Sequence, residues 1–453
     1  MTRGFRHMTN EQYLDFVLRT VEERDVRFVR LWFTDILGNL KSFAISPEDL
    51  EEAFEEGIGF DGSAVEGFAP LEESDMLAIP DPSTFQLLPW RDSEPRVARV
   101  FCDIKTPMQE PFAGDSRACL RRTFEAAEDK GFIMNVGPEI EFFYFDDDQI
   151  PRTQDSAGYF DLTPSDSARV LRRDTTISLE KMSIPVEYSY HALAPSQHGI
   201  HLRHAEALTC ADNIITARHV IKQVAFENGM FASFMPKPFS EMAGSALRIQ
   251  ESLFDHDGEN LFWGPGEDGE PHLSDIARNY IAGLLKYAPE YALVTDPTVN
   301  SYKRPINNGQ VPTHTTWGRR NRSALVRVPT HKPGKTLSTR VELRMPDPTC
   351  NPYLAFAVTL AAGVRGIEEG LVLQPESTLE DAHLSEVEMA RRGYTRLPRD
   401  LGEAIECFQA SSFMREVLGD HIFDYLVAAK TAEWDEYCTT ITSWEREKYY
   451  AGF

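Results

Sequence analysis

The sequence of 453 residues lacks several features that would place it in a class of protein at once. It has no run of about 18 apolar residues, which a transmembrane helix needs. The opening segment, MTRGFRHMTNEQYLDF, lacks the apolar core of a secretory signal. The six cysteines are far apart and include no C-x-x-C pair, so neither a zinc site nor a disulfide framework is expected. We therefore expect a cytoplasmic protein with reduced thiols.

Basic residues are also fewer than acidic ones. The chain has 46 lysines and arginines and 71 aspartates and glutamates, which gives a formal net charge of −25. Nucleic acids and anionic membranes both bind through basic patches, so we expect neither as a partner. A hydrophobic content of 42% and a charged content of 26% are typical of a soluble globular protein. A chain of this length exceeds one ordinary core, so two domains are expected.

Hydrophobic periodicity predicts an α+β protein with a small N-terminal domain and a large mixed-sheet domain. A segment rich in proline, glycine and aspartate predicts a linker, which places the domains at residues 1–107 and 108–453. Strands are expected at residues 26–35, 40–46, 98–104, 133–145, 184–190, 199–203, 325–330 and 339–344. Helices are expected at residues 10–25, 116–131, 211–228, 273–287, 351–370, 401–417 and 421–448.

Two carboxylates, Glu139 and Glu141, lie two positions apart in the strand-like segment PEIEFF. Side chains at that spacing share one face of a strand, where two acids in an apolar run repel each other unless a cation lies between them. An exposed strand edge is the alternative. In RVELRMPD, Glu342 lies between Arg340 and Arg344, and the apolar residues between them predict one face in the core and one lining a cleft. A surface ladder is the alternative there.

Arginine is concentrated in the segment GRRNRSALVRVP, which contains Arg319, Arg320, Arg322 and Arg327, and Arg304 precedes it in NSYKRP. Guanidinium groups are forked donors that suit phosphate or carboxylate. In a chain of net charge −25 we interpret this cluster as an anion-binding site. Pairing with acidic partner segments is the alternative.

These segments belong to a set that resembles the glutamine synthetase family, type I, along nearly the whole chain. The matching motifs are RFVRLWFTDILG, GIGFDGS, PEIEFF, FMPKP, VNSYKR, NRSALVRVP, RVELRMPD and NPYLAFA. Within the family the chain looks most like the actinobacterial γ-glutamyl-amine ligases. The resemblance implies a β-grasp N-terminal domain, a catalytic domain with a curved antiparallel sheet, and two stacked hexameric rings of identical chains. It also implies ATP and Mg²⁺ or Mn²⁺, which the family uses to join glutamate to ammonia or an amine through γ-glutamyl phosphate.

The resemblance assigns three ligands to each of two metal ions, and three of the six are replaced in this chain. The positions are Glu141, Ala192 and Gly199 for one ion, and Glu139, Glu342 and Arg248 for the other. The guanidinium of Arg248 would supply positive charge among the remaining acids and would repel a divalent cation. We therefore expect a metal-depleted site, with weak binding of ATP, Mg²⁺ and Mn²⁺ and no certain cofactor.

The resemblance also carries over further site residues. Its catalytic positions are Asp61 from the neighbouring subunit, Arg344, and Gln310 where the family has a flap glutamate. Its substrate positions are Arg304, Arg344, Tyr159, Gly244 and Arg248. Its nucleotide positions are Glu187, Ser252, Arg322, Arg327 and Arg340.

The stretch YHALAPSQHGIHLRH, residues 190–204, covers the replaced ligand positions and holds four of the twelve histidines but no carboxylate. His201 lies two residues after Gly199 and so on the same strand face, where it has room to act as a general acid or base. Neutral imidazole also suits Zn²⁺, Ni²⁺ or Fe²⁺, so a transition-metal site is the alternative. Against it, His198 and His204 alternate to the opposite face from His201.

We therefore expect a diverged family member that acts on a small carboxylate or amide, with His201 and the arginines as its working groups. Ordinary glutamine synthesis is expected to be weak or absent. Two alternatives stay open. One is an ATP-dependent γ-glutamyl-amine ligase that uses one ion, and the other is a non-catalytic partner of an active paralogue.

Overall fold

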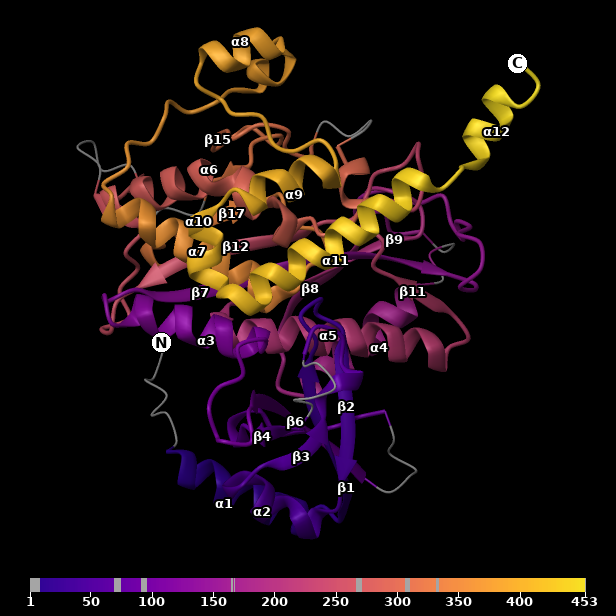
Figure 1. Cartoon of the computed structure of the whole chain (residues 1–453), viewed down its shortest axis with the longest axis vertical. Helices are drawn as coiled ribbons and strands as arrows, with labels where there is room; N and C mark the ends of the chain where they lie inside the picture. Colours follow the sequence, from indigo (N-terminus) through magenta and orange to yellow (C-terminus); the bar gives the residue numbers. More distant parts are fainter. Residues whose placement is uncertain are drawn as a thin grey trace.

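The computed structural model of the chain describes residues 9–68, 75–90, 96–163, 166, 168–265, 271–305, 310–330 and 334–452. A small sheet domain lies at one end, and the larger body contains a second sheet with helices around it (Figure 1). This is the expected α+β architecture with a smaller N-terminal domain.

The N-terminal domain is built on a six-stranded sheet in the order β2-β1-β6-β4-β3, with β5 paired to β6. β1 runs parallel to β6 and antiparallel to β2. A capping box at Thr9 begins α1, which buries Val17 and Val21 in a core separate from that of the larger domain. The elements are α1 (Asn10–Glu23), β1 (Val26–Thr34), β2 (Leu40–Ile45), α2 (Leu50–Glu55), β3 (Ile58–Asp61), β4 (Asp75–Pro80), β5 (Gln86–Leu87) and β6 (Arg96–Lys105).

The large domain contains a nine-stranded sheet in the order β15-β16-β17-β12-β7-β9-β8, with β10 and β11 also paired to β7. All its strand pairs are antiparallel except β15 with β16. The strands are β7 (Ile133–Phe145), β8 (Val186–His191), β9 (Gln197–Leu202), β10 (Ala205–Glu206), β11 (Phe231–Ser233), β12 (Leu247–Phe254), β15 (Trp317–Gly318), β16 (Val326–Arg327) and β17 (Val341–Leu343), and a separate pair is β13 (Trp263–Pro265) with β14 (Pro271–Leu273).

Long helices cover the sheet and form the main core with it. Glycines allow α6 and α7 to approach closely, because a Cβ on Gly283 would lie 2.1 Å from the carbonyl oxygen of Ala362. The helices are α3 (Ser116–Glu128), α4 (Arg169–Lys181), α5 (Ala207–Glu227), α6 (Asp275–Thr295), α7 (Pro352–Glu368), α8 (Glu386–Arg391), α9 (Leu401–Gln409), α10 (Ser412–Leu418), α11 (Asp420–Thr439) and α12 (Ser443–Tyr449). At the C-terminal end α12 extends away from the body (Figure 1).

The sequence-based elements differ from the structure mainly where a single periodic run contains a break. The expected helix 401–417 is two helices, because Ser411 accepts a hydrogen bond from the Met414 amide and caps a new start at α10. The expected helix 421–448 likewise divides at Thr442, which begins α12 with a capping box. The strand β12 was missed altogether, because charged and polar residues interrupt its apolar pattern.

All six cysteines are free, and four of them are buried. None of the helices in the described ranges is long and apolar enough to cross a membrane.

Candidate functional site

The site is built from side chains that strand register places in rows across the large sheet. Residues directly opposite each other in antiparallel strands point to the same face. One row therefore runs from Arg248 on β12 through Glu139 on β7 and His201 on β9 to Tyr188 on β8. All four side chains rise from one face of the sheet.

Two further rows flank the first. One joins Glu141 on β7, Gly199 on β9 and Tyr190 on β8. The other joins Arg327 on β16, Glu342 on β17 and Gln250 on β12. The prediction that Glu139 and Glu141 share a face is therefore correct, as is the prediction for the strand around Glu342, whose neighbours Val341 and Leu343 are in the core.

Most of these side chains line one cavity of about 420 Å³. Six of its lining side chains are arginines and three are glutamates. Apolar, aromatic and uncharged polar residues form the rest of the wall, with Tyr159 and Leu193 about half exposed. The charged lining residues are Glu139, Glu141, Glu342, Arg248, Arg304, Arg322, Arg327, Arg340 and Arg344.

Arg248 lies between the two acids of β7. Its Nη1 is 2.5 Å from Glu139 Oε1 and its Nη2 is 3.0 Å from Glu141 Oε1. Both carboxylates are buried, and they hold the pKa of Arg248 well above its usual value in spite of burial. Burial raises the pKa of Glu141, which the guanidinium of Arg248 opposes. The expected pairing of Arg248 with the acids of β7 is present in the structure.

Glu342, the third acid, is held by two other guanidinium groups. Arg344 Nη1 donates to its Oε1, and Arg327 Nη1 lies 3.1 Å from its Oε2. Burial alone would raise the pKa of Glu342, but Arg344, Arg248 and Arg327 lower it below its usual value. The carboxylate is therefore ionised and already neutralised.

The divalent ions that the family motifs imply do not fit these residues. An Mg²⁺ or Mn²⁺ ion needs several oxygen ligands, and two of the three acids are bound to Arg248 while the third is bound to Arg344 and Arg327. The other candidate positions for ligands are Ala192 and Gly199, which carry no oxygen in their side chains. A metal ion would have to displace Arg248 from between Glu139 and Glu141.

The remaining arginines of the cavity differ in the groups to which they donate hydrogen bonds. Arg304 is buried, with its Nη1 2.9 Å from Asp296 Oδ1 and 2.6 Å from the carbonyl oxygen of Met345. Arg340 donates to Gln250 and to a backbone carbonyl, and pairs with no carboxylate of the residues that the structure describes. Arg322 is exposed at the cavity. The predicted anion-binding cluster is thus partly assembled, but Arg319 pairs with Glu376 instead, and Arg319 and Arg320 are not among the lining residues that the structure describes.

His201 is buried beside the cavity and is not among its described lining residues. Its ring packs edge-on against Tyr188, with 4.9 Å between centroids, and its Nδ1 is 3.3 Å from Glu187 Oε2. Burial lowers the pKa of His201, so the ring is neutral at pH 7. The expectation that Gly199 leaves room for His201 is wrong, because the phenol of Tyr190 fills that space. The acid–base role of His201 stays a prediction.

The opposite face of the same stretch carries a second group of titratable residues. Ligand atoms of Asp155, His191 and His198 lie within 4.8 Å of one another. However, Arg172 Nη1 is 2.7 Å from His198 Nδ1, and because a guanidinium only donates, that nitrogen accepts. Burial and Arg172 hold the pKa of His198 well below its usual value. The neutral ring then carries its proton on Nε2, which argues against the transition-metal alternative.

Three predicted site residues lie away from the cavity in this chain. Asp61 is at the end of β3 in the N-terminal domain, where its Oδ1 accepts from the amide and hydroxyl of Ser63. Ser252 is buried on β12, and Glu187 is exposed on β8. Neither is among the described residues that line the cavity. By contrast, Tyr159, Gly244 and Gln310 do line it, as expected.

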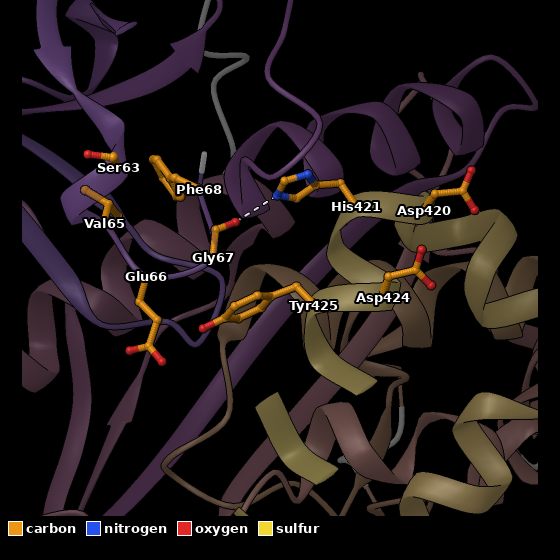
Figure 2. Close-up of a pocket in the computed structure, with 9 residues that line it drawn as sticks. All are labelled: Ser63, Val65, Glu66, Gly67, Phe68, Asp420, His421, Asp424 and Tyr425. Atoms are coloured by element: carbon orange, nitrogen blue, oxygen red, sulfur yellow. Dashed lines mark hydrogen bonds between the residues drawn. The ribbon is translucent and has the colours of Figure 1, made fainter. Parts of the chain in front are cut away.

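A larger hollow of about 660 Å³ lies where the loop after Asp61 meets α11. Figure 2 shows His421 pointing to Gly67, and its Nε2 is 2.7 Å from the Gly67 carbonyl oxygen. The hollow shares no lining residue with the 420 Å³ cavity. The hollow lies where the loop following Asp61 packs against α11.

Sequence reasoning missed Tyr190, Tyr188 and Gln250 as site residues. Tyr190 donates its hydroxyl to Glu139 Oε1, and the other two line the cavity. The available signal was period-two alternation: Tyr188 and Tyr190 share a strand face, and Gln250 shares one with Arg248. Alternation predicts which face of its strand a side chain occupies, but not which strand lies beside it.

Comparison with known proteins agrees with this geometry. Residues 25–107 match the family model described as glutamine synthetase, beta-Grasp domain, and residues 113–449 match glutamine synthetase, catalytic domain. A glutamine synthetase from Mycolicibacterium smegmatis is 51% identical over 96% of this chain and 98% of its own length. One from Methanosarcina mazei is 46% identical over 96% of each chain. A solved structure of GmaS without ligand has a TM-score of 0.82 at 29% identity and covers 96% of this chain and 99% of its own.

The chain therefore belongs to the glutamine synthetase family. The resemblance deduced from the motifs and the α+β fold with a β-grasp domain are both confirmed. Family members generally use ATP and divalent metals, act on small molecules and are typically homo-oligomeric. In this chain the acids available for such metals are bound by arginines.

Proposed function

We propose that this protein is a diverged family member that binds a small glutamate-like carboxylate or amide directly through arginines, without divalent metal. The supporting observation is Arg248, which lies 2.5 Å from Glu139 and 3.0 Å from Glu141. A guanidinium at that point supplies the positive charge that an ion would otherwise bring. The chemistry at this cleft is then repurposed, and ordinary glutamine synthesis is weak or absent.

The charge of the cavity supports an anionic ligand. Six arginines line it against three glutamates, and Asp296 pairs with Arg304 behind the lining, so the lining carries a surplus of positive charge. Arg322 and Arg340 form no ion pair among the described residues. The carboxylate groups of a glutamate-like ligand suit this positively charged lining.

The arrangement suggests a position for each part of such a ligand. Arg327 on β16 lies near Arg340 and Arg344, which directly precede and follow β17. A carboxylate can accept two parallel hydrogen bonds from one guanidinium. Tyr159 stands at the mouth of the cavity, where an amide or amine group would emerge. His201 is neutral and packs behind Tyr188, which lines the cavity.

Phosphoryl transfer from ATP does not suit this cleft. Charge on the transferring phosphoryl group is normally neutralised by divalent ions held by carboxylates. Here Glu139, Glu141 and Glu342 are already neutralised by Arg248, Arg327 and Arg344. Gln310, in place of a flap acid, accepts no proton from an amine.

Two other functions have some support. Likeness to GmaS, a gamma-glutamylmethylamide synthetase, favours an ATP-dependent γ-glutamyl-amine ligase that uses one ion. A non-catalytic partner of an active paralogue is favoured by the replaced ligand positions Ala192, Gly199 and Arg248. The first requires metal for ligand binding, and the second requires no turnover.

Calorimetric titration with glutamate in buffer containing EDTA tests the proposal. We expect saturable binding that Arg344→Ala abolishes, while Arg319→Ala, an arginine paired with Glu376 outside the cavity, leaves it unchanged. With glutamate, ATP, Mg²⁺ and ammonia we expect phosphate release no faster than without enzyme. Binding of glutamate only when Mg²⁺ or Mn²⁺ is supplied, or clear ATP-dependent turnover, would contradict the proposal.

A further inference from the structure

The bare backbone of Gly199 lies directly beneath the ring of Tyr190. A Cβ added to Gly199 would be 2.3 Å from Tyr190 Cζ, 2.4 Å from its Cε1 and 2.5 Å from its hydroxyl oxygen. Real Cβ atoms essentially never come so close, and the Tyr190 ring is buried and cannot swing aside freely. The ring therefore fits only because residue 199 has no side chain.

The phenol of Tyr190 extends from β8 across the backbone of Gly199 on β9 and reaches β7. Tyr190 pairs with Gly199, and Gly199 pairs with Glu141, so all three positions face the cavity. The hydroxyl of Tyr190 reaches diagonally to Glu139 and donates to Oε1. Aromatic rings of Tyr159 and Tyr188 pack against Tyr190, with centroids 5.7 and 5.8 Å away.

The same oxygen of Glu139 accepts from two side chains. Arg248 Nη1 donates to Glu139 Oε1 at 2.5 Å, and the Tyr190 hydroxyl donates to that oxygen as well. A carboxylate oxygen has two lone pairs, so both are used. The phenol thus withholds from a cation the same carboxylate oxygen that Arg248 holds.

We propose that Tyr190 and Gly199 form a complementary pair that closes the metal position to which the family resemblance assigns Gly199. Tyr190 is also a positioning residue that holds Glu139 against Arg248. The cleft then excludes divalent cations at two points, by the guanidinium of Arg248 and by the phenol of Tyr190. This inference rests on the proposed metal-free function and names a second determinant of it. It also explains why Tyr190, on the neighbouring strand, requires glycine at position 199.

Mn²⁺ affinity in variants without Arg248 tests the role of the hydroxyl. Calorimetry would compare Arg248→His with Arg248→His/Tyr190→Phe, which removes only the oxygen atom that donates to Glu139. We expect the double variant to bind Mn²⁺ roughly tenfold more tightly, because the ion no longer has to break a hydrogen bond to the charged carboxylate of Glu139. Tyr144→Phe in the same background is the control, because Tyr144 lies on the opposite face of β7. Equal affinities with and without the Tyr190 hydroxyl would overturn the proposal.

A double-mutant cycle tests the steric half of the pair. Gly199→Ala should lower the melting temperature in the wild type, because its methyl group meets the ring of Tyr190. In a Tyr190→Ala background the same change should lower the melting temperature much less, or not at all, because the ring is gone. An equal drop in the two backgrounds would overturn the pairing.

The two proposals fail separately. Tyr190→Phe leaves Arg248 in place, so glutamate binding in EDTA should persist in that variant if the proposed function is right. Loss of the Mn²⁺ and stability effects with glutamate binding retained refutes only the Tyr190–Gly199 pair. Absence of glutamate binding in the wild type refutes the proposed function, whatever the variants do.

Discussion

At the scale of single residues, the site follows from a few substitutions on a shared strand face. The motifs located Glu139, Glu141, Glu342 and Arg344 in advance, because strand alternation alone determines which side chains point together. The pairing of Arg248 with the acids could also be predicted, since a guanidinium among carboxylates forms ion pairs with them. Tyr190 could not be found, because its partner depends on a register that places residues 190 and 139 diagonally across β9.

Arg248→Ala should destabilise the protein strongly in metal-free buffer. The change leaves Glu139 and Glu141 buried side by side without a counter-charge, and removing one partner of a buried ion pair lowers the free energy of unfolding by roughly 3–5 kcal/mol. Urea denaturation measures this directly. Arg319→Ala, which breaks a half-exposed pair with Glu376, is the control and should change stability by about 0–1 kcal/mol. Equal effects of the two variants would show that Arg248 is not held in the acid pair.

At the scale of elements, long regular segments were predictable and the centre of the site was only partly so. The run from Ile133 to Phe145 has the β-rich composition of a buried strand and forms β7 as expected. β12 was missed because Arg248, Gln250 and Glu251 interrupt its apolar residues. The structure explains the interruption: Arg248 and Gln250 face the cavity, whereas Glu251 points to the helices and accepts from Tyr280 on α6 at 2.8 Å.

The buried Glu251 on β12 predicts that the stability of the fold depends on pH. Burial raises its pKa from 4.5 to about 7, so between those values the folded state keeps a proton that the unfolded state has lost. Stability should therefore fall as pH rises from about 4.5 to 7, by up to about 3 kcal/mol from this group. Glu251→Gln should remove that part of the slope, as measured by urea denaturation from pH 5 to 8. Identical slopes in the wild type and the variant would show that Glu251 is ionised in the folded state.

At the scale of the whole molecule, one chain does not contain every predicted site residue. Asp61 lies in the N-terminal domain, at the end of β3, and is not among the described residues that line the cavity. At the other end, α12 extends from the body (Figure 1), and Trp444 and Tyr449 on it are 60% and 47% exposed. Large exposed aromatic side chains on a projecting helix favour contact with another chain.

We therefore predict a large ring-based oligomer in which a neighbouring chain supplies Asp61. Mass photometry at nanomolar to micromolar concentration should give a mass many times the 51.3 kDa of one chain. Trp444→Ala should weaken the assembly, because it removes apolar area from the projecting helix. A single species of about one chain mass at micromolar concentration would refute both the ring and the role of Asp61 in a neighbour's site.

The central claim, that Arg248 replaces divalent metal, is tested most directly by thermal unfolding of the wild type and Arg248→His with and without Mn²⁺. The account predicts that Mn²⁺ leaves the melting temperature of the wild type unchanged. It should raise that of Arg248→His, in which histidine, Glu139 and Glu342 can ligate one ion, although glutamine synthesis stays absent because Ala192, Gly199 and Gln310 are unchanged. A strong Mn²⁺-induced rise in the wild type that Arg248→His does not alter would contradict it.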